Sequence, residues 1–133
     1  MSSSIRQGEA VTFDVYGRQL AAKAWGDPQG LPTLALHGWL DNANTFDRLA
    51  PQLKELNLVA MDFAGHGYSE HRPPGVHYHS FTDIQDVMAV AAQLGWDRFN
   101  LLGHSMGASI ASELAAMFPE SVERSALIDG FIA

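Results

Sequence analysis

The chain has 133 residues, 47% of them hydrophobic and 17% charged, a composition typical of one globular domain and not of a disordered segment. Fifteen acidic and eight basic residues give a net charge of −7, which disfavours nucleic acid and anionic membranes as partners because their phosphates would be repelled. With no cysteine, no secretion signal at residues 1–7 and no apolar stretch of membrane-spanning length, we expect a cytoplasmic protein that lies outside the membrane.

Two patterns predict the strands. Apolar residues alternate with polar ones at Val11, Phe13 and Val15, and after a turn at residues 16–18 a second run at 19–25 completes the pattern of an antiparallel hairpin. Short continuous apolar runs bounded by turn residues predict buried parallel strands. They lie at residues 33–36 and 56–61, and around residues 101–102 and 126–128.

Helical spacing of apolar residues predicts a helix over residues 81–94, capped by Ser80 or Thr82 and ended by Gly95. A second helix follows residue 105, carries small residues that can lie close against a sheet, and ends before Pro119. A proline within residues 46–53 predicts a bent or broken helix there. Strands that alternate with helices predict an α/β fold, a doubly wound, mostly parallel sheet preceded by an antiparallel hairpin.

The segment GHSMG at residues 103–107 lies between a predicted buried strand and a predicted helix. A serine on such a sharp turn leaves room only for small residues two positions before and after it, and Gly103 and Gly107 meet that demand. The amide N–H groups at the start of the helix can stabilise an oxyanion. We therefore interpret Ser105 as a candidate catalytic nucleophile, the alternative being a glycine-rich turn with an idle serine.

Three further segments, in order along the chain, resemble those of the α/β-hydrolases. They are LALHGW at residues 34–39, AMDFAGHGYS at 60–69, and the stretch from FPE at 118–120 to ALID at 126–129. With the GHSMG segment, the resemblance extends from about residue 10 to residue 133. It implies an incomplete α/β-hydrolase fold, with strands 1 to 6 only.

In that family the catalytic triad runs in chain order nucleophile, acid and then a histidine near the end of a considerably longer domain. All six histidines of this chain precede Ser105. The resemblance therefore implies that residues 1–133 are the N-terminal part of a single α/β-hydrolase domain. The triad histidine, the C-terminal portion and the cap would then lie outside this chain.

The resemblance also assigns roles around Ser105. The oxyanion hole would be the backbone N–H groups of Trp39 and Met106, and the pocket would include His37, Gly38 and His104. The side chain of Trp39 either walls an acyl pocket or merely covers an apolar edge.

Two aspartates leave alternatives open. Asp129 is a possible triad acid, because it follows the predicted strand after the nucleophile helix; alternatively it caps the turn at Gly130 or lines the pocket while the acid comes later. Asp62 precedes a glycine-containing loop and is expected to hold that loop through backbone N–H groups.

A metal site is not expected. His71, His77 and His79 with Asp83 are the residues that could suggest one, but no helical H-E-x-x-H motif or cysteine partner accompanies them. The first three lie in a segment that has the pattern of a surface loop. No cofactor is implied either.

These residues predict a serine hydrolase that forms an acyl-enzyme on a small-molecule acyl substrate. Esterase, lipase-like, thioesterase, lactonase and carbon–carbon bond hydrolase activities remain open. A serine at the elbow points away from the dehalogenase and epoxide-hydrolase branches, which attack with a carboxylate.

Two alternatives are an inert fragment and a ligand-binding or receptor protein of the same fold with little turnover. The family topology would leave the last strand as an unpaired edge and an apolar flank uncovered. We therefore expect a companion chain that carries the C-terminal half, or self-association.

Overall fold

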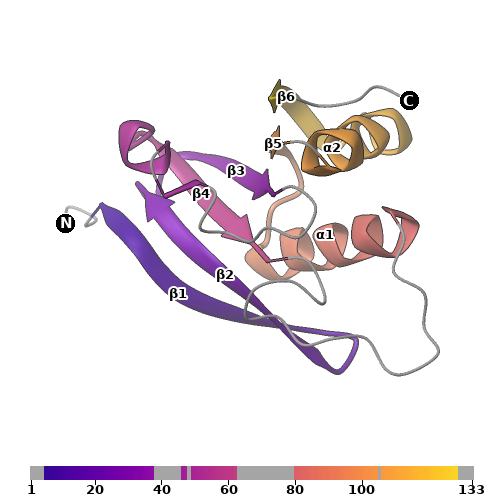
Figure 1. Cartoon of the computed structure of the whole chain (residues 1–133), viewed down its shortest axis with the longest axis horizontal. Coiled ribbons are helices and arrows are strands. Elements are labelled where there is room, and N and C mark those ends of the chain that lie inside the picture. Colours follow the sequence, from indigo (N-terminus) through magenta and orange to yellow (C-terminus); the bar gives the residue numbers. More distant parts are fainter. Residues whose placement is uncertain (1–4, 38–45, 48, 63–79, 105, 129–133) are drawn as a thin grey trace.

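The computed structural model of the chain describes residues 5–37, 46–47, 49–62, 80–104 and 106–128 (Figure 1). Within these residues one sheet has the strand order β1-β2-β4-β3-β5-β6. Its strands are β1 (Arg6–Val15), β2 (Arg18–Gly26), β3 (Leu31–Leu36), β4 (Leu56–Met61), β5 (Phe99–His104) and β6 (Val122–Ile128). The predicted class, a mostly parallel sheet with an N-terminal antiparallel hairpin, is confirmed.

The direction of pairing changes once across the sheet. β1 pairs with β2 and β2 with β4 in antiparallel fashion, whereas β4, β3, β5 and β6 run parallel to one another. Parallel neighbours need long crossover connections, and the helices supply them. The four parallel strands therefore end at the same edge of the sheet.

Several strands, among them β1, β3 and β6, are longer than the sequence pattern predicts; β6 begins at Val122 and not near residue 126. β1 begins at Arg6 because a register shift between Gln7 and Glu9, with Gly8 at a φ of 78°, lets it continue toward the N-terminus. Such a bulge breaks the alternation of apolar and polar residues, so the pattern reveals only the later half of the strand. β3 begins at Leu31 and tolerates Pro32 near its start, where proline is permitted in a strand.

The predicted helices are present. α1 spans Ser80–Leu94 and is followed by Gly95 at a φ of 75°, as expected of a glycine that ends a helix. α1 begins at Ser80, so Thr82 lies within its first turn. α2 spans Met106–Met117, and the predicted broken helix is a short 3-10 turn, η2 (Ala50–Gln52), that contains a proline. Neither α1 nor α2 is long and apolar enough to cross a membrane.

The two faces of the sheet bury separate apolar clusters. Leu34 and Leu36 of β3 belong to the larger cluster, which α1 and α2 cover together, and Figure 1 shows both helices on one side of the sheet. Ala35 points to the other face and belongs to a smaller cluster with Phe46 and Ala50. Residues 46–53 therefore cover part of the face opposite the helices.

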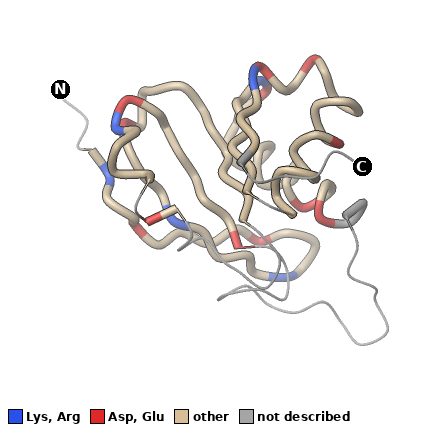
Figure 2. The backbone as a smooth tube through the Cα atoms, turned by 45° about the horizontal axis from the view of Figure 1, so that its top comes forward, with Lys and Arg blue, Asp and Glu red and all other residues tan. Residues whose placement is uncertain are grey.

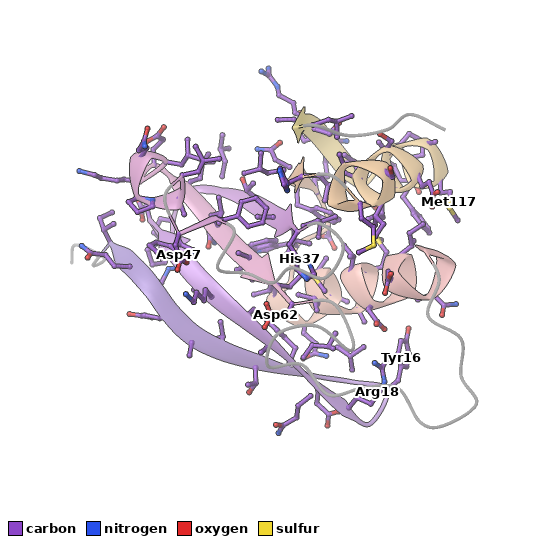
Figure 3. All side chains as sticks on the ribbon, in the orientation of Figure 1. Tyr16, Arg18, His37, Asp47, Asp62 and Met117 are labelled. Carbon is purple, nitrogen blue, oxygen red and sulfur yellow. The ribbon has the colours of Figure 1, made fainter. Side chains whose placement is uncertain are left out.

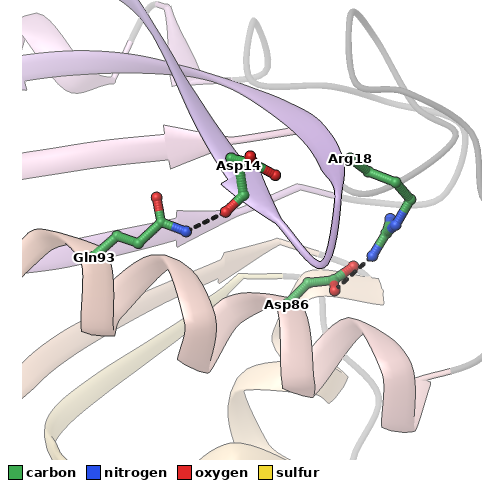
Figure 4. A network of polar contacts seen from close by, with 4 residues as sticks. All are labelled: Asp14, Arg18, Asp86 and Gln93. Carbon is green, nitrogen blue, oxygen red and sulfur yellow. Dashed lines mark hydrogen bonds and ion pairs between the residues drawn. The ribbon is translucent and has the colours of Figure 1, made fainter.

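An ion pair links the hairpin to α1. Arg18 at the start of β2 donates to Asp86 of α1 over 3.1 Å, and the two side chains are 13% and 2% exposed (Figure 4). The side-chain amide of Gln93 also donates to the backbone carbonyl of Asp14 (Figure 4). The hairpin end is thus held on α1 by two polar contacts, which the apolar spacing of the helix does not predict.

Basic residues are dispersed over the fold. Figure 2 shows the lysines and arginines of the described residues as separate short segments, with no continuous basic stretch along the tube. The exclusion of nucleic acid as a partner stays a prediction.

We expect Asp86→Ala to lower the free energy of unfolding by about 3 kcal/mol, because it leaves a mostly buried guanidinium without its carboxylate. The matched control is Glu123→Ala, which breaks an ion pair with Arg98 whose side chains are 54% and 56% exposed. That loss should be below about 0.5 kcal/mol. Urea unfolding followed by circular dichroism measures both values, and equal losses would contradict the structural role of the Arg18–Asp86 pair.

Candidate active site

The carboxyl ends of the parallel strands bring several predicted site residues to one edge. Leu36 of β3 is in register with Met61 of β4 and Gly103 of β5, and His104 is in register with Ile128 of β6. The residues that end or directly follow these strands therefore lie along the same edge. In parallel α/β sheets this edge is where ligands bind.

Of the predicted site residues, His37, His104 and Met106 are described by the structure. Gly38, Trp39, Ser105 and Asp129 lie outside the described residues. Each of these four follows a strand end closely in sequence, and their place in one site stays a prediction.

The connection between β5 and α2 is very short. β5 ends at His104 and α2 begins at Met106, so Ser105 alone joins the strand to the helix. The first N–H groups of a helix have no acceptor within it and carry a partial positive charge. The half-buried Met106, the first residue of α2, thus offers a backbone donor immediately after the candidate nucleophile.

The two glycines that flank this connection are required by backbone contacts. A Cβ atom at Gly107 would lie 2.1 Å from the carbonyl oxygen of Leu36 and 2.7 Å from that of His37. A Cβ atom at Gly103 would lie 2.6 Å from the Cα atom of Ala108. Because real Cβ atoms do not approach so closely, the start of α2 rests directly on the end of β3, in agreement with the predicted demand for small residues.

His37 and Asp62 are buried polar residues at the carboxyl ends of β3 and β4, and both are labelled in Figure 3. His37 is 0% and Asp62 3% exposed, and the backbone N–H of Asp62 donates to the carbonyl of Ala21 over 2.8 Å. His37 is therefore part of the buried interior at this edge. The expected loop-holding role of Asp62 depends on residues outside the described part and stays a prediction.

One shift in pKa concerns a residue far from this edge. Burial lowers the pKa of the Arg6 guanidinium, while the negative charges of Glu9 and Asp27 oppose the shift. Arg6 lies at the opposite end of the sheet, where it donates to the carbonyl of Trp25 over 3.1 Å and to the side chain of Asn57. Its role is to tie the start of β1 to β2 and β4.

Of the residues that could suggest a metal site, only Asp83 lies in the described structure. His71, His77 and His79 lie outside the described residues, and Asp83 is buried in α1. No group of three histidine, cysteine, aspartate or glutamate side chains in the described part is arranged to hold a metal ion.

Sequence reasoning missed the buried acids of α1, Asp83 and Asp86, which it assigned to no role in the fold. The two residues are three positions apart and therefore lie on the same side of the helix, next to the apolar residues. This spacing was a weak signal that both are buried.

Comparisons with known proteins identify relatives of this chain. A family model described as alpha/beta hydrolase fold matches residues 33–133. A human "Serine hydrolase-like protein" is 50% identical over 111 residues, which are 83% of this chain and 55% of that protein. The lipase LipV of Mycobacterium tuberculosis is 32% identical over 117 residues, covering 86% of this chain and 42% of the lipase.

A solved structure extends the comparison to the fold. A hypothetical protein from Pseudomonas aeruginosa superposes with a TM-score of 0.92 at 54% identity, covering 94% of this chain and 44% of that one. The chain spans about half the length of these relatives.

We expect Gly107→Ala to lower the free energy of unfolding by about 3 kcal/mol, because the new methyl group meets rigid backbone atoms of β3. The control is Gly95→Ala, where no atom lies within 4 Å and only the φ of 75° opposes a side chain. It should cost about 1 to 2 kcal/mol. A smaller loss for Gly107→Ala than for Gly95→Ala would show that α2 does not rest on β3.

Proposed function

The chain belongs to the α/β-hydrolase family, and we propose that it carries the nucleophile and oxyanion hole of a serine hydrolase that acts on esters or related carbonyl compounds. The observation that supports this most directly is the β5–α2 connection, in which Ser105 alone joins strand to helix between two sterically required glycines. Because the chain belongs to this family and its relatives are named as hydrolases, we expect the protein to be a hydrolase. The ester class and the serine nucleophile are the proposal.

The proposed reaction is acyl transfer through a covalent intermediate. The Oγ atom of Ser105 attacks the carbonyl carbon of the substrate while a histidine takes the hydroxyl proton. The backbone N–H groups of Met106 and Trp39 stabilise the oxyanion. The tetrahedral intermediate collapses, and the leaving alcohol takes the proton from the histidine. Water, deprotonated by the same histidine, then attacks the acyl-enzyme and releases the carboxylic acid, while the proton returns to Ser105.

The histidine of this mechanism is proposed to come from polypeptide beyond this chain. All six histidines precede Ser105 in the sequence, and the fully buried His37 is poorly placed to exchange a proton with a bound substrate. Residues 1–133 would then be the N-terminal part of a single domain, with the cap and C-terminal portion elsewhere. Asp129 is the proposed acid, with a turn-capping or pocket-lining role as the alternative.

The printed names of the relatives support the serine assignment without deciding the substrate. One is called serine hydrolase-like and another a lipase. We include a cytoplasmic location in the proposal, because a chain without cysteine needs no oxidising compartment in order to fold. An inert fragment is the second candidate, favoured by the short span of the chain relative to these proteins.

A fusion of this chain to the C-terminal portion of the Pseudomonas aeruginosa relative tests the nucleophile. We expect a fluorophosphonate to add one adduct at Ser105 in the fusion, and at least about 100-fold more slowly in the 133-residue chain, because the proposed general base lies outside it. Intact and peptide mass spectrometry measure the adduct. Ser105→Ala should remove it, whereas Ser109→Ala, the next serine along α2, should keep it; an adduct that survives Ser105→Ala would refute the assignment.

The same fusion tests the acyl-enzyme. With p-nitrophenyl acetate we expect a burst of nitrophenolate equal to the concentration of labelled Ser105, followed by slower turnover, because deacylation lags acylation in such reactions. Ser105→Ala should lower the steady rate at least about 1,000-fold. Stopped-flow absorbance measures both phases, and an unchanged rate in the variant would leave the inert-fragment alternative standing.

A further inference from the structure

A hollow lies at the end of the sheet that is remote from the candidate active site. Its volume is about 340 Å³, room for about ten molecules of water at ~30 Å³ each. The start of β1, the end of β2 and the segment between η2 and β4 form its walls. The lining includes Ile5, Arg6, Trp25, Ala50, Pro51 and Lys54. Residues 5–54 therefore supply every wall that the described structure gives this hollow.

The hollow lies at the amino ends of the parallel strands. Lys54 precedes β4, which begins at Leu56, and Arg6 is in register with Gly26 at the end of β2. The candidate active site follows the carboxyl ends, beyond Met61 of β4. β4 has six residues, so roughly 17 Å of strand separates the two places. A small ligand in the hollow is therefore out of reach of the candidate active site.

Backbone contacts hold the walls in place. The backbone N–H of Asp27 donates to the carbonyl of Lys54 over 2.9 Å, which ties the segment before β4 to the turn after β2. A Cβ atom at Gly8 would lie 2.9 Å from the indole ring of Trp25, so this ring packs directly on the backbone of β1. The hollow is thus largely pre-formed, as ligand pockets usually are.

Arg6 brings one unused donor to the hollow. Its Nε and Nη2 atoms donate to the backbone carbonyls of Gly26 and Trp25, at 3.3 and 3.1 Å, and Nη2 also donates to the side chain of Asn57. Among the residues that the structure describes, Nη1 has no acceptor. Burial lowers the pKa of this guanidinium, which marks a cation that has lost part of its hydration. An anion that meets Nη1 replaces that hydration.

Lys54 supplies the second cation. It forms no ion pair with another described residue, whereas the only other lysine of the chain, Lys23, is paired with an aspartate over 3.0 Å. No acidic side chain of the described part lines the hollow, and the charges of Glu9 and Asp27 act on the guanidinium from outside it. In a chain of net charge −7, two cations at one hollow form a local site for an anion.

The rest of the wall is mainly apolar. Ile5 is 43% exposed, and Trp25, Ala50 and Pro51 continue the apolar surface. The guanidinium and the ammonium can each donate to one oxygen of a carboxylate, while the apolar surface suits a hydrocarbon group. A phosphate carries more oxygens than these two donors serve, and a buried oxygen without a donor is costly. The lining therefore favours a carboxylate with an apolar group.

We propose that this hollow is a binding site for a small organic carboxylate. The two carboxylate oxygens accept from Nη1 of Arg6 and Nζ of Lys54, and the apolar group lies against Ile5, Trp25 and Pro51. The site is separate from the one that follows the strand ends, so the proposal does not rest on the proposed hydrolase activity.

Phenylacetate and its uncharged counterpart phenylacetamide test the proposal by isothermal titration calorimetry of the 133-residue chain. We expect a Kd of about 1 mM for phenylacetate and binding at least about tenfold weaker for phenylacetamide, because the amide loses the charge-assisted hydrogen bonds. Lys54→Met should weaken the binding of phenylacetate about tenfold. Lys23→Met removes the same charge outside the hollow and should leave the Kd unchanged. Equal circular dichroism spectra show that both variants keep the fold.

The two lysines also allow the site to be observed directly. Reductive ¹³C-methylation keeps the charge of each lysine and gives each its own NMR signal. Phenylacetate should shift the signal of Lys54 and leave that of Lys23 in place, and Lys54→Met assigns the signal. A merely structural role of Lys54 would produce no such shift.

The outcomes separate this site from catalysis. Phenylacetate that binds no better than phenylacetamide, or a Kd that Lys54→Met leaves unchanged, overturns the proposal. Inorganic phosphate that binds as tightly as phenylacetate overturns the assignment to a carboxylate with an apolar group. Ser105→Ala should bind phenylacetate as the parent does. If that variant loses binding, the ligand occupies the candidate active site and the hollow is not its site; if it binds normally while Ser105 takes up no fluorophosphonate in the fusion, only the proposed function fails.

Discussion

The contact between the start of α2 and the end of β3 is the constraint on which the proposed site depends. Gly107 lies so near the carbonyl oxygens of Leu36 and His37 that no side chain fits between helix and strand. This fixes the first N–H groups of α2 beside His37, the residue that directly follows β3. Two separate parts of the chain therefore converge on one edge, and the donors of the proposed oxyanion hole come one from each part.

The two faces of the sheet are completed in different ways. On one face α1 and α2 bury the larger cluster, and the Arg18–Asp86 pair fastens the hairpin to α1. On the other face Phe46 and residues 49–53 supply only a partial cover, and within the described residues an apolar groove stays open beside Leu102 and Ala126. The described residues thus cover one face of the sheet more completely than the other.

The sequence predicts the features that depend on local pattern. Apolar runs identify the parallel strands, and the small residues at Gly103 and Gly107 predict a tight strand-to-helix turn. It does not predict the contacts between residues that are distant in the chain. Nothing near Asp86 in the sequence reveals that its partner is Arg18, 68 positions away. Likewise, nothing near Gly107 reveals that it lies against the carbonyl oxygen of Leu36. Trp39 and Asp129 lie outside the described residues, so their proposed roles rest on the sequence alone.

The strand order has a consequence for how the chain folds as it is synthesised. β3 lies between β4 and β5, yet both neighbours are made after it, and β5 begins only at Phe99. The hairpin of β1 and β2 can form early from local contacts, whereas Leu34 and Leu36 must wait for distant segments to cover them. In a nascent chain with this topology an apolar strand stays paired on one side only until β5 (Phe99–His104) has been made, a condition that favours chaperone binding.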